Sequence, residues 1–137
     1  MALGKTYNIF ISHCWDYSKD YDNLIGLLDQ DSRRLNYRDY SIPKDDPIHT
    51  RSENVLLEAI ENKIKMCSVI IVVSRVAITY QYWSKKEIEI AHKYNKPVLA
   101  LKPLNADYQS TVAVEGADCE VSWRTDSIIE AIKQYGG

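Results

Sequence analysis

The run "SVIIVVS" at residues 68–74 constrains the fold more than any other part of the sequence. It consists of β-branched apolar residues between two serines, and no polar residue alternates with them. A run of this kind is typical of a strand that is covered on both faces, as in a parallel sheet. The sequence therefore predicts an α/β fold in which helices pack on both sides of the sheet.

Strand and helix patterns alternate along the rest of the chain. Further strands are expected at residues 7–12, 35–40, 97–102 and 120–123, and amphipathic helices at residues 16–30, 50–66, 81–94 and 125–135. Thr50 and Glu53 fit a capping box, and Thr125 or Asp126 is expected to cap the last helix. The alternation predicts a single α/β domain over residues 1–137, with a parallel sheet and right-handed crossovers.

Composition narrows the class of protein. The chain has 137 residues, 45% of them hydrophobic, which is enough for a core. The net charge of -2 comes without a basic stripe, so we expect no nucleic-acid partner. We also expect no membrane association, because there is no signal-peptide pattern and no apolar run long enough to cross a bilayer. Cys14, Cys67 and Cys119 lack CxxC spacing, which favours reduced thiols in a cytoplasmic protein. The scattered histidines do not predict a metal site.

An acidic residue interrupts the apolar face of the helix expected at residues 81–94. With Trp83 set at 0°, Ile90, Tyr94, Ala91 and Ile88 fall in one arc between about 340° and 140°. Lys85, His92 and Glu89 fall opposite, between about 180° and 240°. Glu87 falls at about 40°, inside the apolar arc, where burial would raise its pKa.

Ligands of parallel sheets bind beyond the carboxyl ends of the strands, so the segments that follow the strands are candidates for a site. "SHCWD", "RDYSIPKDD" and "SRVAITYQYW" should meet there, with Glu87 just downstream. GxGxxG and Walker A patterns are absent, so backbone donors and a few side chains would have to hold a nucleotide. The candidate side chains are those of Ser12, His13, Ser74 and Arg75.

Four segments, "NIFISHCWD", "YRDYSIP", "VIIVVS" and "YWSKKE", occur in the order and spacing of the boxes of the TIR domain superfamily. The sequence resembles most closely the bacterial TIR-like proteins of Thoeris-type antiphage systems. The resemblance implies a flavodoxin-like fold with a five-stranded parallel sheet. It also implies cleavage of the bond between nicotinamide and ribose in NAD, which would be the substrate, with no further cofactor.

The family's catalytic helix carries Trp, three further residues, then Glu, and Trp83 and Glu87 match this motif. The resemblance thus implies that Glu87 is the catalytic carboxylate. Ser84 stands where the family often has Cys, and Pro43-Lys44 stands where animal members often have Pro-Gly. His13–Trp15 also differs from the residues that follow the first strand in animal members. These departures argue against the role of an animal receptor adaptor.

A single carboxylate suffices for the implied chemistry. The nicotinamide ring of NAD is a cation and leaves as a neutral molecule, so no acid has to protonate it. The enzyme must instead stabilise positive charge on the ribose, which a carboxylate does best in a water-poor pocket. Trp83, one turn earlier, would wall the pocket or stack on nicotinamide, or simply pack in the core. Asp39 would bind the substrate, shape the loop after the second strand or serve as a turn residue.

The resemblance further implies a signalling product, either a cyclised ADP-ribose or ADP-ribose joined to a small acceptor. A downstream effector protein that senses this product would be the partner, and a homo-oligomer is compatible with the family. The loop at residues 40–49 should border the site and influence turnover or assembly. One alternative is a non-catalytic module that assembles through its loops and helices. Another is a flavodoxin-like binder of phosphate or flavin, which the first loop, poor in Gly, Ser and Thr, disfavours.

Overall fold

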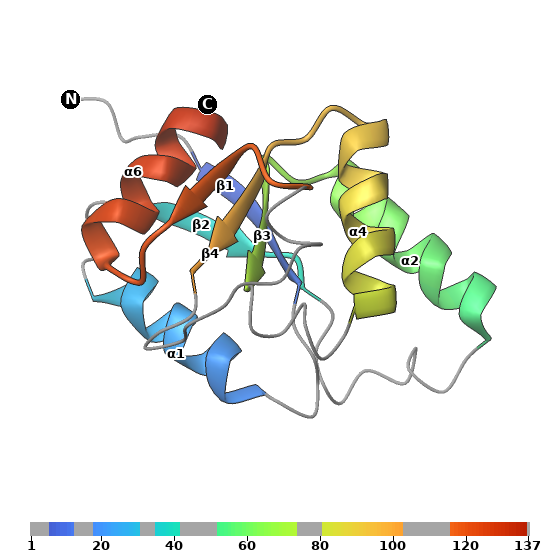
Figure 1. Cartoon of the computed structure of the whole chain (residues 1–137), viewed down its shortest axis with the longest axis horizontal. Helices are drawn as coiled ribbons and strands as arrows, with labels where there is room; N and C mark the ends of the chain where they lie inside the picture. The colour runs from blue at the N-terminus through green and yellow to red at the C-terminus, as the bar shows by residue number, and fades with distance from the viewer. Residues whose placement is uncertain are drawn as a thin grey trace.

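The computed structural model describes residues 6–12, 18–30, 35–41, 52–73, 81–102 and 116–136. They form a parallel sheet between two layers of helices (Figure 1). The strands are β1 (Thr6–Ser12), β2 (Asn36–Asp39), β3 (Val69–Val73), β4 (Val98–Leu101) and β5 (Cys119–Val121). The helices are α1 (Ser18–Asp29), α2 (Glu53–Lys65), α4 (Gln81–Lys93) and α6 (Thr125–Gly136).

The sheet has five strands in the order β2-β1-β3-β4-β5, and every neighbouring pair is parallel. The flavodoxin-like α/β fold is thereby confirmed, and this order is the usual one for that fold. All five residues of β3 are buried, as the unbroken β-branched run predicts. The strand order reverses between β1 and β3, so the carboxyl ends of these two strands form the topological switch point, where ligands of this fold bind.

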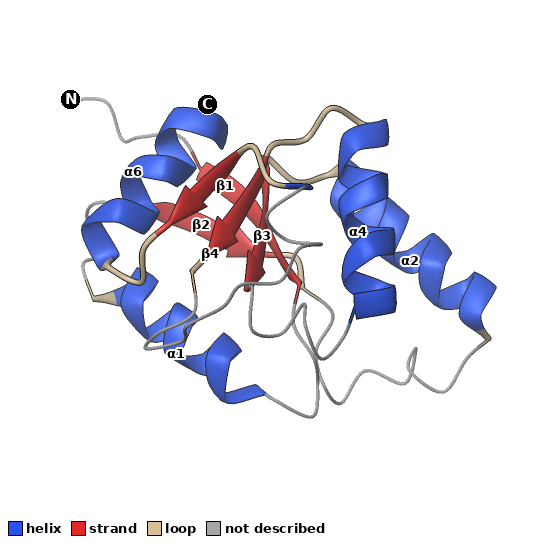
Figure 2. Cartoon of the chain, in the orientation of Figure 1, coloured by secondary structure: helices blue, strands red, loops and turns tan. Residues whose placement is uncertain are grey.

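The helices cover both faces of the sheet (Figure 2). Alternate residues of the strands pack against α1 and α6 on one face and against α2 and α4 on the other. In β1, Ile9 and Ile11 belong to the core on the first face, and Phe10 belongs to the core on the second. Because side chains alternate along a strand, Ser12 points to the same face as Phe10, toward α4.

Two predicted caps are wrong. Helix α2 begins at Glu53 with Ser52 as its N-cap, and the Ser52 hydroxyl accepts a hydrogen bond from the amide of Val55. Thr50 therefore lies two residues before the cap. Helix α6 begins at Thr125, so Thr125 and Asp126 are both inside its first turn. The Thr125 hydroxyl lies 3.2 Å from the carbonyl oxygen of Leu27 and 2.8 Å from Oε1 of Gln30, which joins α6 to the end of α1.

Most of the other helix and strand boundaries lie within one or two residues of the predicted ones. Strand β5 ends at Val121 rather than Trp123, because its partner β4 ends at Leu101, which pairs with Val121. Helix α4 ends at Lys93, and Asn95 then adopts a φ of 56° while the Lys96 amide bonds the carbonyl of Ala91. This is a Schellman-type ending, in which Asn tolerates the left-handed conformation. Among the described helices, none is long and apolar enough to cross a membrane.

Candidate functional site

Glu87 lies in the second turn of α4, the next described helix after β3, and its side chain is only 5% exposed. The neighbouring residues Ile88 and Ala91 are also buried, whereas Lys85 and Glu89 are exposed. The helical spacing therefore gives the correct orientation of α4, and the acid does lie on its buried face. A carboxyl group at such a position needs a polar partner, because burying an unpaired polar group is costly.

Ser12 provides that partner from the last position of β1. Its hydroxyl donates a hydrogen bond of 2.5 Å to Oε1 of Glu87, and Ser12 is 1% exposed. A second buried hydroxyl, that of Ser84, lies 3.4 Å from the Ser12 hydroxyl oxygen. Ser84 is fully buried on α4, three residues before Glu87. The three side chains form a buried polar cluster, Ser12–Ser84–Glu87, at the switch point between β1 and β3.

The environment of Glu87 changes its ionisation. Burial raises the pKa of Glu87 to about 8, and the hydrogen bond from Ser12 opposes this shift only in part. Strands β3 and β4 carry no titratable side chain, and no charged group among the described residues contributes to the shift. At neutral pH burial therefore favours the protonated form of the Glu87 carboxyl group in the empty site.

Trp83 lies one turn before Glu87 and is half-buried. It packs against the core beneath α2 and α4, and its ring meets that of Tyr82 edge-on at a centroid distance of 5.4 Å. These contacts cover part of the indole ring of Trp83. The role of Trp83 at the nicotinamide ring stays a prediction.

Asp39, at the end of β2, shapes the chain that follows. Its Oδ1 accepts a hydrogen bond of 2.9 Å from the amide of Ser41, an Asx-turn arrangement. The buried Ser41 hydroxyl in turn accepts a hydrogen bond of 2.9 Å from the amide of Ile11 in β1. Asp39 thus helps to bring the start of the following loop against β1, one residue before Ser12. The Asx turn fits a turn residue as well as a loop-shaping role for Asp39. A contact of Asp39 with substrate stays a prediction.

The remaining predicted site residues, His13, Ser74 and Arg75, lie outside the described residues, as does the segment at residues 42–51. Their proposed contacts with a nucleotide stay predictions. Among the described candidates, the structure brings Ser12 and Glu87 into direct contact.

Sequence reasoning missed Ser84 as a member of the cluster. A signal was present, because Ser84 falls at about 100° on the helical projection, inside the same arc as Glu87. Ser41 was also missed, and its role depends on a contact with a residue 30 positions away in the chain. No local pattern reveals such a contact.

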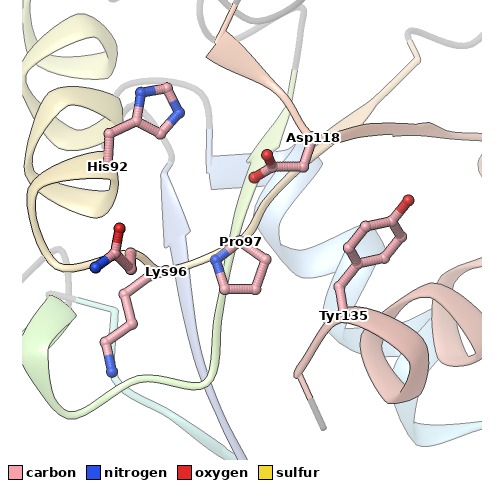
Figure 3. Close-up of a pocket in the computed structure, with 6 residues that line it drawn as sticks. His92, Lys96, Pro97, Asp118 and Tyr135 are labelled. Carbon is pink, nitrogen blue, oxygen red and sulfur yellow. The ribbon is translucent and has the colours of Figure 1, made fainter.

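A separate pocket lies at the end of the strands that faces away from Ser12 and the switch point. Figure 3 shows residues that line it. It has a volume of about 540 Å³, and its lining residues are His92, Asn95, Lys96, Pro97, Asp118 and Tyr135. Pro97 and Asp118 directly precede β4 and β5, so this pocket is at the amino ends of the strands. Oδ2 of Asp118 accepts a hydrogen bond of 2.8 Å from the amide of Val98. Glu87 is not among the residues that line this pocket, so we do not assign the pocket to the site around Glu87.

Comparisons with known proteins add a family and a fold. The family model of the TIR-like domain of Thoeris protein ThsB matches residues 10–108, a range that includes Ser12, Ser84 and Glu87. A CMP N-glycosidase from Clostridium botulinum superimposes with a TM-score of 0.53 at 14% identity, over 93% of this chain and 98% of that chain. A 3-dehydroquinate dehydratase-like protein from Bifidobacterium longum gives a TM-score of 0.53 at 11% identity, over 97% and 96% of the two chains. A search of curated proteins found no match.

The two solved structures share the fold of this chain, and identities this low carry no more than that. The family model, by contrast, spans most of the chain, from the middle of β1 past the end of β4. The chain therefore belongs to the family of TIR-like domains of the Thoeris defence protein ThsB.

Proposed function

We propose that this protein cleaves NAD, releases nicotinamide and converts the ADP-ribose part into a signalling nucleotide during antiphage defence. The observation that carries the proposal is the buried Glu87, held by Ser12 at the topological switch point of the sheet. Membership of the Thoeris ThsB family supports the biological setting.

In the proposed reaction, the bond between the ribose C1′ and the nicotinamide nitrogen breaks, and its electron pair stays with nicotinamide. Nicotinamide leaves neutral, and positive charge develops on the ribose. The ionised Glu87 stabilises this charge, either directly or by accepting hydrogen bonds from the ribose hydroxyls. A nucleophile then adds to C1′ and loses its proton, which gives a cyclic ADP-ribose when the nucleophile is on the adenine part and a conjugate when it is a separate acceptor.

The raised pKa of Glu87 suits a cationic substrate. In the empty site the carboxyl group is mostly protonated at neutral pH, so no uncompensated charge is buried. When the nicotinamide cation of NAD arrives, the opposite charge favours the carboxylate and lowers the pKa of Glu87. The site thus gains its negative charge when a positively charged ring is present to pair with it.

A non-catalytic assembly module has no need for this arrangement. Such a module would interact through its exposed surfaces, where acids remain solvated, whereas Glu87 is buried away from them. The proposal also includes a downstream effector protein that senses the product, and a homo-oligomer. Both come from the resemblance to the Thoeris family.

The test is an incubation of the purified protein with NAD, followed by chromatography for nicotinamide and mass spectrometry for the nucleotide product. The protein should be assayed alone and after extraction from phage-infected cells, because activation can depend on infection. Equimolar nicotinamide and an ADP-ribose derivative are expected. Unchanged NAD in both preparations would contradict the proposed activity.

A further inference from the structure

We propose that Ser84 is a positioning residue that acts on Glu87 through Ser12, by orienting the Ser12 hydroxyl so that it holds Oε1 of the carboxylate. This inference rests on the proposed function of Glu87 and adds to it a control over when the carboxylate forms. Ser84 itself does not touch the reacting atoms in this account.

The direction of the hydrogen bonds follows from counting protons. Ser12 has one hydroxyl proton, and its 2.5 Å bond to Oε1 of Glu87 uses that proton. The oxygen of Ser12 can then only accept, and the Ser84 hydroxyl lies 3.4 Å from it. When Glu87 is ionised, the chain therefore runs from Ser84 to Ser12 to Glu87. Among the described residues, Ser12 is the only hydrogen-bond partner of the Glu87 carboxyl group.

The placement of Ser84 is hard to explain by packing alone. It is fully buried within α4, where alanine would form helix more readily and would leave no polar group to satisfy. A serine at this position is compensated only if its hydroxyl has a partner, and Ser12 is that partner. The distance of 3.4 Å is long for two hydroxyl groups. Charge on Glu87 would polarise Ser12 and strengthen this contact, so Ser84 favours the ionised form of Glu87 over the neutral form.

Other charges do not obscure this effect among the described residues. Strands β3 and β4 are wholly apolar, and Lys85 and Glu89 are exposed on the other side of α4. Helix α2 packs against α4, and its acids Glu58 and Glu61 do not contribute to the shift at Glu87. The hydroxyl chain is thus the main polar influence on Glu87 that these residues provide.

The test measures the ionisation of Glu87 directly, by carbon NMR of the labelled carboxyl group, with the signal assigned by its loss in Glu87→Gln. In Ser84→Ala the midpoint of this titration should move upward by about 0.5 to 1 pH unit, because the Ser12 hydroxyl loses the contact with Ser84 that supports its hydrogen bond to the carboxylate. Cysteine is nearly isosteric with serine but is a weaker hydrogen-bond donor. The midpoint in Ser84→Cys should therefore fall between the midpoints of the wild type and Ser84→Ala. Ser68→Ala is the control, since Ser68 contacts Asn8 at the other end of β1 and should leave the midpoint unchanged.

A double-mutant cycle separates positioning from packing. Ser12→Ala should raise the midpoint further than Ser84→Ala, and the double variant should match Ser12→Ala, because Ser84 acts through Ser12. Additive shifts, or no shift in Ser84→Ala, would overturn the proposal. In NAD assays below the midpoint, Ser84→Ala should lose about 3- to 10-fold in kcat/KM, with less loss at high pH. A protein that shows these titration shifts but leaves NAD intact would contradict the proposed function and not the role of Ser84.

Discussion

The hydroxyl of Ser12 donates a 2.5 Å hydrogen bond to Oε1 of Glu87, joining the last residue of β1 to the second turn of α4. The two residues are 75 positions apart in the chain, and both are buried. This bond fixes the carboxyl group at the switch point of the sheet and opposes, in part, the effect of burial on its pKa.

The first prediction concerns the pH dependence of turnover. If ionised Glu87 is the active form, kcat/KM for NAD should rise about tenfold per pH unit below the midpoint and level off above about pH 8, where the carboxyl group of the free enzyme is ionised. The midpoint for kcat should be lower, because the bound nicotinamide cation lowers the pKa of Glu87. Initial rates between about pH 5.5 and 9 measure both. A flat kcat/KM over this range would mean that Glu87 has an ordinary pKa or is not required.

The second prediction concerns stability. Glu87→Gln should be at least as stable as the wild type at pH 4 and more stable at pH 8. Because the pKa of Glu87 is about 8 when folded and near 4.5 when unfolded, the cost to folding is absent below about pH 4.5. The cost grows as pH rises between these two values and is constant above the higher one. At about 1.4 kcal/mol per unit, it amounts to a few kcal/mol.

Melting curves of both proteins at the two pH values provide the measurement. A solvated acid in the first turns of a helix would give the opposite sign, because losing its interaction with the helix dipole costs about 0.3–1 kcal/mol. A lower melting temperature for Glu87→Gln at pH 8 would therefore show that the carboxylate is paired with a cation or is solvated.

The third prediction concerns the start of α2. Ser52→Ala should lower the free energy of unfolding by about 0.5–2 kcal/mol, since the hydroxyl of Ser52 caps the amide of Val55. Thr50→Ala is the matched control and should have a smaller effect, although Thr50 and Glu53 fit a capping box in the sequence. Urea denaturation of both variants distinguishes them, and a larger loss for Thr50→Ala would assign the cap to Thr50 instead.

The fourth prediction concerns the approach of Gly116 to α4. A Cβ atom at Gly116 would lie 2.5 Å from Cγ2 of Ile88, a buried and conformationally stiff side chain next to Glu87. Gly116→Ala should therefore destabilise the fold by about 1–3 kcal/mol and shift the helix that carries Glu87. Gly26→Ala is the control, because its Cβ would meet nothing within 4 Å, and this change within α1 should stabilise by about 0.5–1 kcal/mol. Equal melting temperatures for the two variants would contradict this packing.

The sequence predicts those parts of the fold that depend on local periodicity. The unbroken apolar run of β3 predicts a parallel sheet covered on both faces, and the helical phase of α4 predicts the burial of Glu87. The contact between Ser12 and Ser84 is different, because it joins residues 72 positions apart through the packing of α4 on the sheet. The cap at Ser52 was missed because two hydroxyl residues, Thr50 and Ser52, precede the same helix, and only backbone geometry selects between them.

The most direct test of the account is NAD cleavage by three matched proteins: the wild type, Glu87→Gln and Glu89→Gln. Glu89 lies on the same helix but is exposed, so Glu89→Gln removes the same charge without touching the buried cluster. Nicotinamide release should be abolished in Glu87→Gln and close to the wild-type rate in Glu89→Gln, with both variants folded. Near wild-type turnover in Glu87→Gln would contradict the assignment of Glu87 as the catalytic carboxylate.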